Sequence, residues 1–492
     1  GTNKIERYIG RLDLVNVDIA NLSKKIQKVD QISGRVDFQP DLLTVQSLQG
    51  TYSDVPFDAS GTVESFKELR LNGRIRSNLD LNKILALAPE EQKRMLSGLD
   101  IQGACEAVTT LRGSLRTPAE IETEYKLLLK NATVAVKNKK PFMRSLNCGI
   151  VMNLRGLQIV DARFLSGPRA YLLNAFFPKI KTAPGNLSLQ SSGFRIGMDY
   201  FVEGNDLRVP SGKFRYLGLS ADFKGKVVNF KDPFLNINGT ASLDLENARE
   251  LFTRHAPFLK EAGLSGFLAG PFTLSGAWNQ PLDWDLKLDA KTDTLWVKKT
   301  RLDSFRTQFL LKERKLQIPF LHSALYGGSF GARALVDWSR PKPYFDAKMY
   351  ANNLNLSKIG ASLDPPKKEL AGNMIFQMGL RGYMGAKENW RGQGAFSVSK
   401  GHLWKSSLFK QMGHLPFVKV EGLDTVTFSE AGSTFSIHHQ RVWTEDLTIL
   451  GDTVDLSLEG SVGFEQDLNM EMTVQYSSAV LRGALDTGGL VP

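Results

Sequence analysis

The chain has 492 residues, of which 42% are apolar and 23% are charged, and its formal net charge at pH 7 is +11. This composition buries apolar surface on folding, so it excludes wholesale disorder. The excess positive charge is modest for the length and lies in short, scattered clusters, which indicates solvated strand edges and loops and argues against a nucleic-acid partner. No run of about 18 or more apolar residues is present, so the sequence contains no candidate membrane-spanning helix.

The N-terminal residues already have the pattern of a strand. Residues 7–19, RYIGRLDLVNVDI, alternate between apolar and polar side chains, and no hydrophobic signal core precedes them. At the other end, GGLVP (488–492) is similar to the left half of an engineered protease site. We therefore expect the sequence to be part of a longer protein, with a membrane anchor that lies outside it.

Alternation with a period of two recurs along the chain. Residues 69–75 and 120–129 place apolar side chains at every second position and polar ones between them, and residues 283–290 and 455–462 do the same. Because successive side chains of a strand point to opposite faces, each segment predicts a strand with one apolar and one polar face. Many such strands, separated by Gly, Asn and Pro, predict an antiparallel all-β chain.

Pairs of apolar-x-Gly triplets, ten residues apart, occur three times: Ile101-Gln102-Gly103 with Leu111-Arg112-Gly113, Leu264-Ser265-Gly266 with Leu274-Ser275-Gly276, and Leu370-Ala371-Gly372 with Leu380-Arg381-Gly382. A proline follows the second glycine after five residues in the first two copies, at Pro118 and Pro281. The copies predict a β-repeat with units near 69–130, 235–290 and 345–390. We expect the two triplets of a pair to occupy equivalent positions on neighbouring strands, with glycine where a strand bends or a neighbour approaches closely.

Three segments have the periodicity of short helices: 82–98, 246–263 and 407–417. Three short helices cannot cover the apolar faces of roughly thirty strands, and those faces need a cover. Two arrangements remain open: a sheet closed on itself, as in a sandwich or β-solenoid, or a curled sheet whose lengthwise apolar groove holds a ligand. Acyl chains suit such a groove, because each buried methylene contributes about 0.8 kcal/mol.

Sequence patterns that carry catalysis or metal binding are missing. The six histidines include no His-Glu-x-x-His motif, and the sequence has no phosphate-binding loop, dinucleotide fingerprint or nucleophile turn. We interpret His438 and His439 as a surface pair, because neighbours on a strand face opposite sides. Cys105 and Cys148 are interpreted as buried free thiols, and YGGSFG (326–331) as a tight turn or bulge. We therefore expect a protein that is not an enzyme and that uses no cofactor or metal.

Residues 392–476 resemble the AsmA-like C-terminal region. The stretch GQGAFSVSKGHLWKSSLFKQMGHLPF (392–417) ends a strand in a Gly-x-Leu segment before a short helix, and a Leu-x-Gly-x-Val segment follows at 458–462. LYGGSFGARALVDW (325–338) and YFDAKMYANNLNLSKI (344–359) are also similar to this superfamily. The resemblance implies a periplasmic member of the AsmA/TamB/YhdP group of Gram-negative envelope proteins, in which a twisted β-sheet forms a long groove that carries phospholipid between membranes. It implies no catalytic residues.

These patterns together predict an all-β fold: an elongated, repetitive antiparallel sheet, taco-like or similar to an open β-solenoid, curled into a lengthwise hydrophobic groove with a few short α-helices. The repetitive groove region is expected over 1–390 and the AsmA-like region over 391–492. From the alternation, we predict that acyl chains contact Leu69, Leu71, Ile75, Leu79, Ile121, Tyr125, Leu127, Leu129, Trp284, Leu286, Leu288, Phe376, Met378, Leu380, Leu456, Leu458, Val462, Met470, Met472 and Val474.

The predicted function is bridge-like phospholipid transfer between the inner and outer membranes, in the periplasm and anchored to the inner membrane in the full-length protein. The expected partners are phospholipids, the inner membrane, and outer-membrane or other envelope proteins. One alternative is an envelope-assembly scaffold or chaperone that guides outer-membrane β-barrel proteins by strand pairing. A second alternative, a closed β-solenoid adhesin or carbohydrate-acting protein, requires an exposed ladder of aromatics or paired acids, and the seven tryptophans are spread too widely to indicate one.

Overall fold

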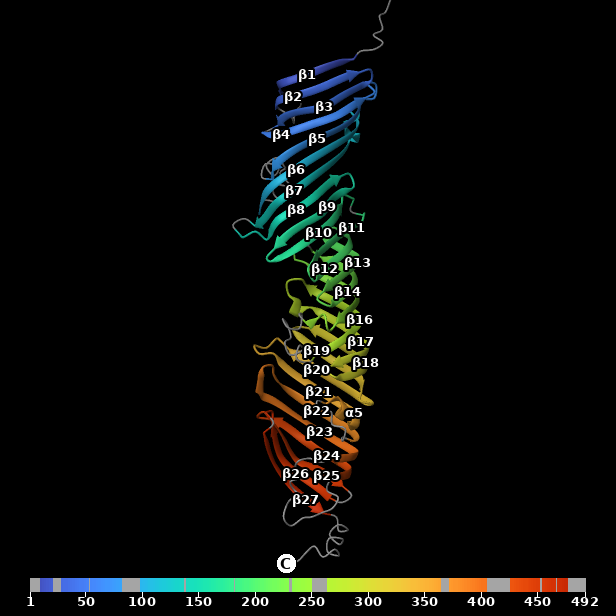
Figure 1. The fold of residues 1–492 in the computed structure, drawn as a ribbon, viewed down its shortest axis with the longest axis vertical. Helices are drawn as coiled ribbons and strands as arrows, with labels where there is room; N and C mark the ends of the chain where they lie inside the picture. Colours follow the sequence, from blue (N-terminus) through green and yellow to red (C-terminus); the bar gives the residue numbers. More distant parts are fainter. Residues whose placement is uncertain are drawn as a thin grey trace, which may run out of the picture. The chain divides into compact units, whose positions relative to one another are not determined.

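The computed structural model describes residues 9–20, 28–52, 54–81, 98–136, 139–180, 182–229, 232–249, 263–363, 371–404, 425–451, 454–465 and 467–476. These residues form 27 strands, one α-helix and two short 3-10 helices, which confirms the predicted all-β fold class. The chain divides into two compact units, residues 1–216 and 217–492, which we describe separately (Figure 1). No helix among the described residues has the length and apolar character needed to cross a membrane.

Unit 1 is an antiparallel meander, in which each strand pairs with the strands before and after it in the chain. Its strands are β1 (Gly10–Ala20), β2 (Lys28–Gln39), β3 (Leu42–Tyr52), β4 (Val55–Glu64), β5 (Arg70–Asp80), β6 (Leu99–Ser114), β7 (Glu122–Val136), β8 (Met143–Asn153), β9 (Gly156–Ser166), β10 (Arg169–Pro178), β11 (Gly185–Ser191), β12 (Phe194–Glu203) and β13 (Asp206–Tyr216). The 3-10 helix η1 (Pro118–Glu120) precedes β7. Within the described part of the unit, no pairing joins β1 to β13, so its sheet is open.

Unit 2 repeats this arrangement with a second antiparallel meander. Its strands are β14 (Leu219–Val228), β15 (Phe234–Asp244), β16 (Leu264–Ala277), β17 (Asp285–Val297), β18 (Thr300–Lys312), β19 (Lys315–Leu325), β20 (Gly328–Asp337), β21 (Tyr344–Asn355), β22 (Ala371–Tyr383), β23 (Ala386–Trp404), β24 (Thr425–His438), β25 (Arg441–Gly451), β26 (Val454–Gly463) and β27 (Leu468–Tyr476). The 3-10 helix η2 (Pro281–Asp283) precedes β17. No pairing closes β14 onto β27 in the residues described for this unit. Of the two arrangements left open by the sequence, each unit therefore adopts the open sheet.

Two-residue turns connect several of the hairpins. Tyr326 and Gly327 join β19 to β20 with φ angles of 49° and 84°, and Glu313 and Arg314 join β18 to β19 with φ angles of 50° and 61°. Positive φ at both central residues is the geometry of a type I′ turn, whose twist matches that of the strands it connects. The interpretation of YGGSFG as a tight turn is thus confirmed.

The paired apolar-x-Gly triplets lie on one strand, so the prediction that they mark neighbouring strands is wrong. β6 and β16 each contain both of their triplets, and β22 contains its pair except for the first residue. The strands are longer than the alternation suggested, because their hairpin turns lie beyond the triplets. The first glycines, Gly103, Gly266 and Gly372, have φ angles of 138°, 117° and 121° and lie at shifts in register with the next strand. They mark β-bulges, where the strand bends.

The second glycine of each pair makes room for a residue eight positions later. The pairs are Gly113 with Ile121, Gly276 with Trp284 and Gly382 with Trp390. A Cβ added at Gly276 would lie 2.5 Å from Cδ1 of Trp284, and one at Gly382 would lie 2.7 Å from Cδ1 of its tryptophan. The indole of Trp284 is fixed there by a hydrogen bond of 2.7 Å from Nε1 to the Ala277 carbonyl oxygen. The close approach predicted for these glycines is confirmed.

Helices form a small part of the described structure. The predicted helices at 82–98 and 407–417 lie outside the described residues except for Gly98, and 246–263 is described only at its ends. The helix α5 (Leu356–Ser362) is not among the predicted helices; it begins after Asn355, whose side chain accepts a hydrogen bond of 3.1 Å from the Lys358 amide. The expected division between 390 and 391 falls inside β23.

Candidate functional site

The predicted lining residues of unit 1 share one face of its sheet, which we call the apolar face of unit 1. Cross-strand register aligns Ile75 on β5 with Tyr125 on β7 through the intervening strand β6, and aligns Leu79 with Leu129 in the same way. Every second residue of a strand points to the same side of the sheet. The register therefore shows which residues of β5, β6 and β7 share a face with Ile75 and Tyr125. The same face holds Leu71, Leu127 and Ile121, and Leu69 lies in the turn before β5.

Burial of this face changes along β7. Leu129 is 8% exposed and belongs to a core cluster, Leu127 is half-buried, and Tyr125 is 42% exposed. Ile75, opposite Tyr125 across β6, is also among the exposed apolar residues. The apolar face is therefore buried at the margin near Leu129, which we call the dry margin, and open to solvent near Tyr125. In a closed core both positions would be buried.

The dry margin holds both cysteines of the chain. Cys105 on β6 and Cys148 on β8 each pair with Leu129, and both are buried and free, as the sequence analysis predicts. Burial, reinforced by the nearby Cys105, raises the pKa of the Cys148 thiol to about 11, and burial also raises the pKa of Cys105. Both groups are uncharged at neutral pH and act as small apolar side chains.

The apolar face of unit 2 is continuous through the register of its sheet. One row crosses consecutive strands from β16 to β21 and consists of Leu274, Leu286, Leu311, Leu316, Val336 and Phe345. Leu288 lies two residues from Leu286 on this face, and Trp284 lies over Gly276 at its border. The predicted residues of this region are thus brought together on one side of the sheet.

A second row continues this face from β22 to β27. It consists of Leu380, Gly392, Ile437, Val442, Val462 and Leu468. Phe376 and Met378 precede Leu380 at alternate positions of β22, and the remaining predicted residues face one another between β26 and β27, as Leu456 with Val474, Leu458 with Met472, and Gly460 with Met470. Leu456 is buried, whereas Val462 is among the exposed apolar residues.

Ring contacts indicate that the sheet of unit 2 curls toward its apolar face. Trp390, at the start of β23, and Phe464, just after β26, have ring centroids 6.1 Å apart. These strands are three positions apart in the sheet, which is about 14 Å along a flat sheet. Trp390 also meets Phe345 of β21 edge to face, with ring centroids 5.5 Å apart. The apolar side chains of distant strands therefore converge on this side.

Alternation alone does not identify the apolar-face residues that follow a β-bulge. On β7 the apolar face passes from Leu127 and Leu129 to Ala132 and Val134, because the register shifts at Asn131, which has a φ angle of 50°. On β17 and β18 it passes likewise to Leu295 and Leu302, which are buried in a second core cluster. A bulge inserts one residue, so it moves every later side chain to the other face. On β7 and β18 the phase change is marked in the sequence by Asn131 and Ser304, which have φ angles of 50° and 53°, whereas β17 has no Asn or Ser at this place.

The opposite, polar faces carry cross-strand ion pairs. On β1 and β2, Arg11 Nε lies 3.0 Å from Asp37 Oδ1, and Arg35 Nε lies 2.9 Å from Asp13 Oδ1. Each exposed pair contributes about 0–1 kcal/mol, so their main effect is to keep this face solvated. On β7 the Lys126 ammonium, by its hydrogen bond and charge, lowers the pKa of the Glu124 carboxyl.

His438 and His439 differ from their predicted arrangement. His439 leaves the strand, with a φ angle of 48°, so the two Nδ1 atoms approach to 3.1 Å instead of pointing to opposite faces. His438 stacks on Trp443, with ring centroids 5.4 Å apart. No group of three or more metal-ligating side chains occurs among the described residues, so the pair has no further protein ligand there.

The rows described above consist of apolar residues and glycine, and the polar side chains of Ser433, Thr444 and Asp446 near them are hydrogen-bonded to one another. Such a surface suits a ligand that is long, flexible and apolar, because these rows supply no side-chain donor or acceptor to fix one polar group in place. No family model and no curated protein sequence matches the chain.

Proposed function

We propose that the protein binds phospholipid acyl chains along the apolar faces of its sheets and supports phospholipid transfer between the inner and outer membranes, as a periplasmic, AsmA-like protein of the Gram-negative envelope. One observation carries this proposal: in each unit the apolar face is continuous through the register yet remains partly open, with Tyr125 and Val462 exposed on it. A soluble chain tolerates such a surface when a ligand covers it.

The dimensions of the sheets suit acyl chains. Each unit has more than ten strands at about 4.8 Å spacing, so each face runs roughly 60 Å across its strands. An extended chain of about sixteen carbons is roughly 20 Å long, so it crosses about four strands. Each methylene that leaves water contributes about 0.8 kcal/mol, whichever strand it lies on. Because no single position dominates, the chain can slide along the face while its head group stays in water at the open edge.

A second candidate function rests on the edge of unit 1. In the part of the chain that the structure describes, β1 pairs only with β2, and Leu12, Val15 and Ile19 on it are exposed. An unpaired, apolar edge is a template for another strand, which supports a scaffold that guides β-barrel precursors. This function predicts binding of an unfolded barrel precursor that survives acidic substitutions on the apolar faces, whereas lipid binding does not survive them.

Lipid extraction tests the first proposal. The protein is purified without detergent from the envelope fraction and extracted with organic solvent, and the extract is analysed by mass spectrometry. The expected result is phospholipid in a reproducible ratio to protein, reduced in a Leu288→Asp variant and unchanged in Lys287→Asp on the opposite face. An extract of the folded wild-type protein that contains no phospholipid would contradict the proposal.

A further inference from the structure

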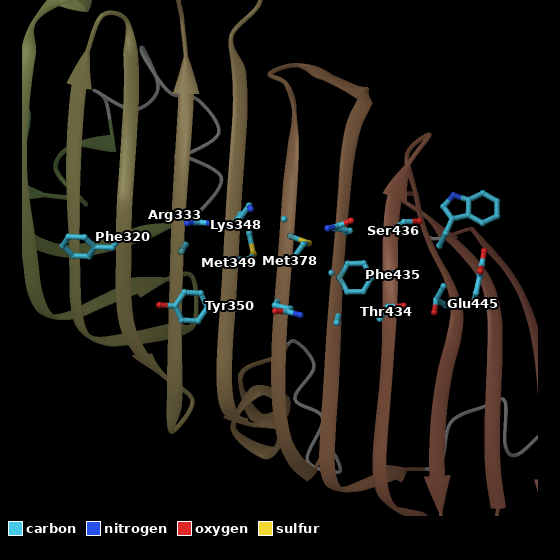
Figure 2. A pocket seen from close by; sticks show the side chains of 18 of the residues that line it. Phe320, Arg333, Lys348, Met349, Tyr350, Met378, Thr434, Phe435, Ser436 and Glu445 are labelled. Atoms are coloured by element: carbon cyan, nitrogen blue, oxygen red, sulfur yellow. The ribbon is translucent and has the colours of Figure 1, made fainter.

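The polar face of unit 2 carries a hollow that the proposed lipid function does not use. It has a volume of about 890 Å³ and crosses β19 to β25 (Figure 2). Two rows of aligned residues line it: Arg333, Lys348, Gly379, Gln393, Ser436 and Trp443 form one row, and Tyr350, Gln377, Ala395 and Thr434 form the other. Met349, Met378 and Phe435, which also line it, are the intervening residues of the apolar face. The hollow therefore lies on the side of the sheet opposite to the acyl-chain surface.

Two aromatic rings are exposed in this hollow, although alternation makes its face polar. Tyr350 is 48% exposed and lies over Gly331, where a Cβ would be 2.3 Å from its Cζ. Phe320 is 46% exposed and lies at a shift in register between Ile318 and Leu321. A β-bulge changes the direction in which side chains point. At this bulge the phenyl ring of Phe320 lies in the hollow and not in the core. Gly379 and Ala395, on β22 and β23, keep the floor low between Tyr350 on β21 and Trp443 on β25.

Several polar side chains around the rings have no ion pair or side-chain hydrogen bond among the described residues. Some charged side chains elsewhere on the polar face are paired, as in Arg301 with Asp303 on β18. Within the described part of the chain, Arg333, Lys348 and Glu445 form no ion pair, and the amides of Gln377 and Gln393 form no side-chain hydrogen bond. The Trp443 Nε1–H, at one end, is buried and has no acceptor among these residues. An unsatisfied buried donor is rare in folded proteins.

We propose that this hollow binds an oligosaccharide, laid across the strands. A pyranose ring has an apolar C–H face, which suits the exposed rings of Phe320 and Tyr350, and hydroxyl groups at its edge, which suit amides and charged side chains of both signs. The distance from β19 to β25 is about 29 Å, which accommodates about five or six sugar residues. Arg333 and Lys348 lie on β20 and β21, near one end of the hollow, and Glu445 lies on β25 at the other end, so no row of cations follows its length to bind a polyanion. The paired strands of the floor leave no free backbone groups for a peptide to pair with.

The test is titration of the folded chain with two hexasaccharides, β-1,4-linked N-acetylglucosamine and β-1,4-linked glucose, followed by calorimetry and by NMR of the sugar. We expect saturable binding of at least one. Tyr350→Ala and Phe320→Ala each weaken it about fivefold or more. Ile375→Ala, an exposed apolar residue on the same face outside the hollow, changes it less than about twofold.

Two outcomes would overturn the oligosaccharide site: no binding of either sugar at millimolar concentration, or binding that Tyr350→Ala and Phe320→Ala leave unchanged. Binding of an acidic peptide or a phospholipid head group at this hollow, with neither sugar bound, would overturn it as well. The result is independent of the lipid proposal, because Leu288→Asp lies on the other face and is expected to retain the affinity of the wild type for the sugar.

Discussion

At the scale of single residues, the glycines of the repeat have two separate roles. Gly103, Gly266 and Gly372 allow a bulge through their φ angles, whereas Gly113, Gly276 and Gly382 leave space for a side chain or backbone that crosses them. The sequence predicts both roles but places the glycines on the wrong strands, because the spacing of ten residues does not reveal where a hairpin turns.

Gly382 offers a steric test with a matched control on the same strand. A Cβ at Gly382 would lie 2.7 Å from Trp390 Cδ1, whereas a Cβ at Gly379 would meet nothing nearer than Lys348 Cγ at 3.9 Å. We expect Gly382→Ala to lower the free energy of unfolding by about 1–3 kcal/mol, because the indole must move. Gly379→Ala is expected to change it by less than about 0.5 kcal/mol. Denaturant unfolding measures both, and equal effects would contradict the close contact.

The thiol of Cys148 gives a pH-dependent prediction. Its pKa in the folded chain is about 11, above the ordinary value of 9.0, because burial disfavours the thiolate. The neutral thiol therefore contributes stability that is fully present below pH 9 and is lost as the pH rises through 11. Unfolding free energies measured across this range should fall more steeply for the wild type than for Cys148→Ala. Parallel curves would show that the thiol is not desolvated.

At the scale of elements, the strand faces follow from alternation until a bulge intervenes. Residues 283–290 predict the face of β17 correctly, yet Leu295 on the same strand was missed, because the phase changes between them. The register of consecutive strands, which decides that Leu286 and Phe345 lie in one row, depends on turn geometry and bulges and is not readable from periodicity. The polar-face hollow was missed for the same reason, since its aromatic residues come from distant strands.

Acidic substitutions on two strands can distinguish an open apolar face from a closed core. Leu288 is half-buried, so the carboxylate of Leu288→Asp can reach water, and we expect the fold to survive with less bound lipid. Leu129 lies within the core cluster, so Leu129→Asp buries an unpaired charge and should destabilise unit 1 by several kcal/mol, roughly 3–5. Circular dichroism and denaturant unfolding measure the stability of each variant. Unfolding of Leu288→Asp to the same extent as Leu129→Asp would contradict the open face.

At the scale of the whole molecule, each unit is an open sheet with one apolar and one polar face. The composition and alternation predict this class of fold, and the open sheet is the property on which the lipid proposal depends. A closed barrel or sandwich would place Tyr125 and Val462 in a dry interior, whereas both are exposed on the apolar faces.

Site-specific photo-cross-linking of living cells tests the central claim most directly. A benzophenone amino acid at position 288 points to the apolar face, and the same group at 287 points to the polar face. The matched positions in unit 1 are 127 and 126. The proposed function predicts phospholipid adducts at 288 and 127, with few at 287 and 126. Equal labelling of both faces, or no phospholipid at 288 and 127 in the folded protein, would contradict it.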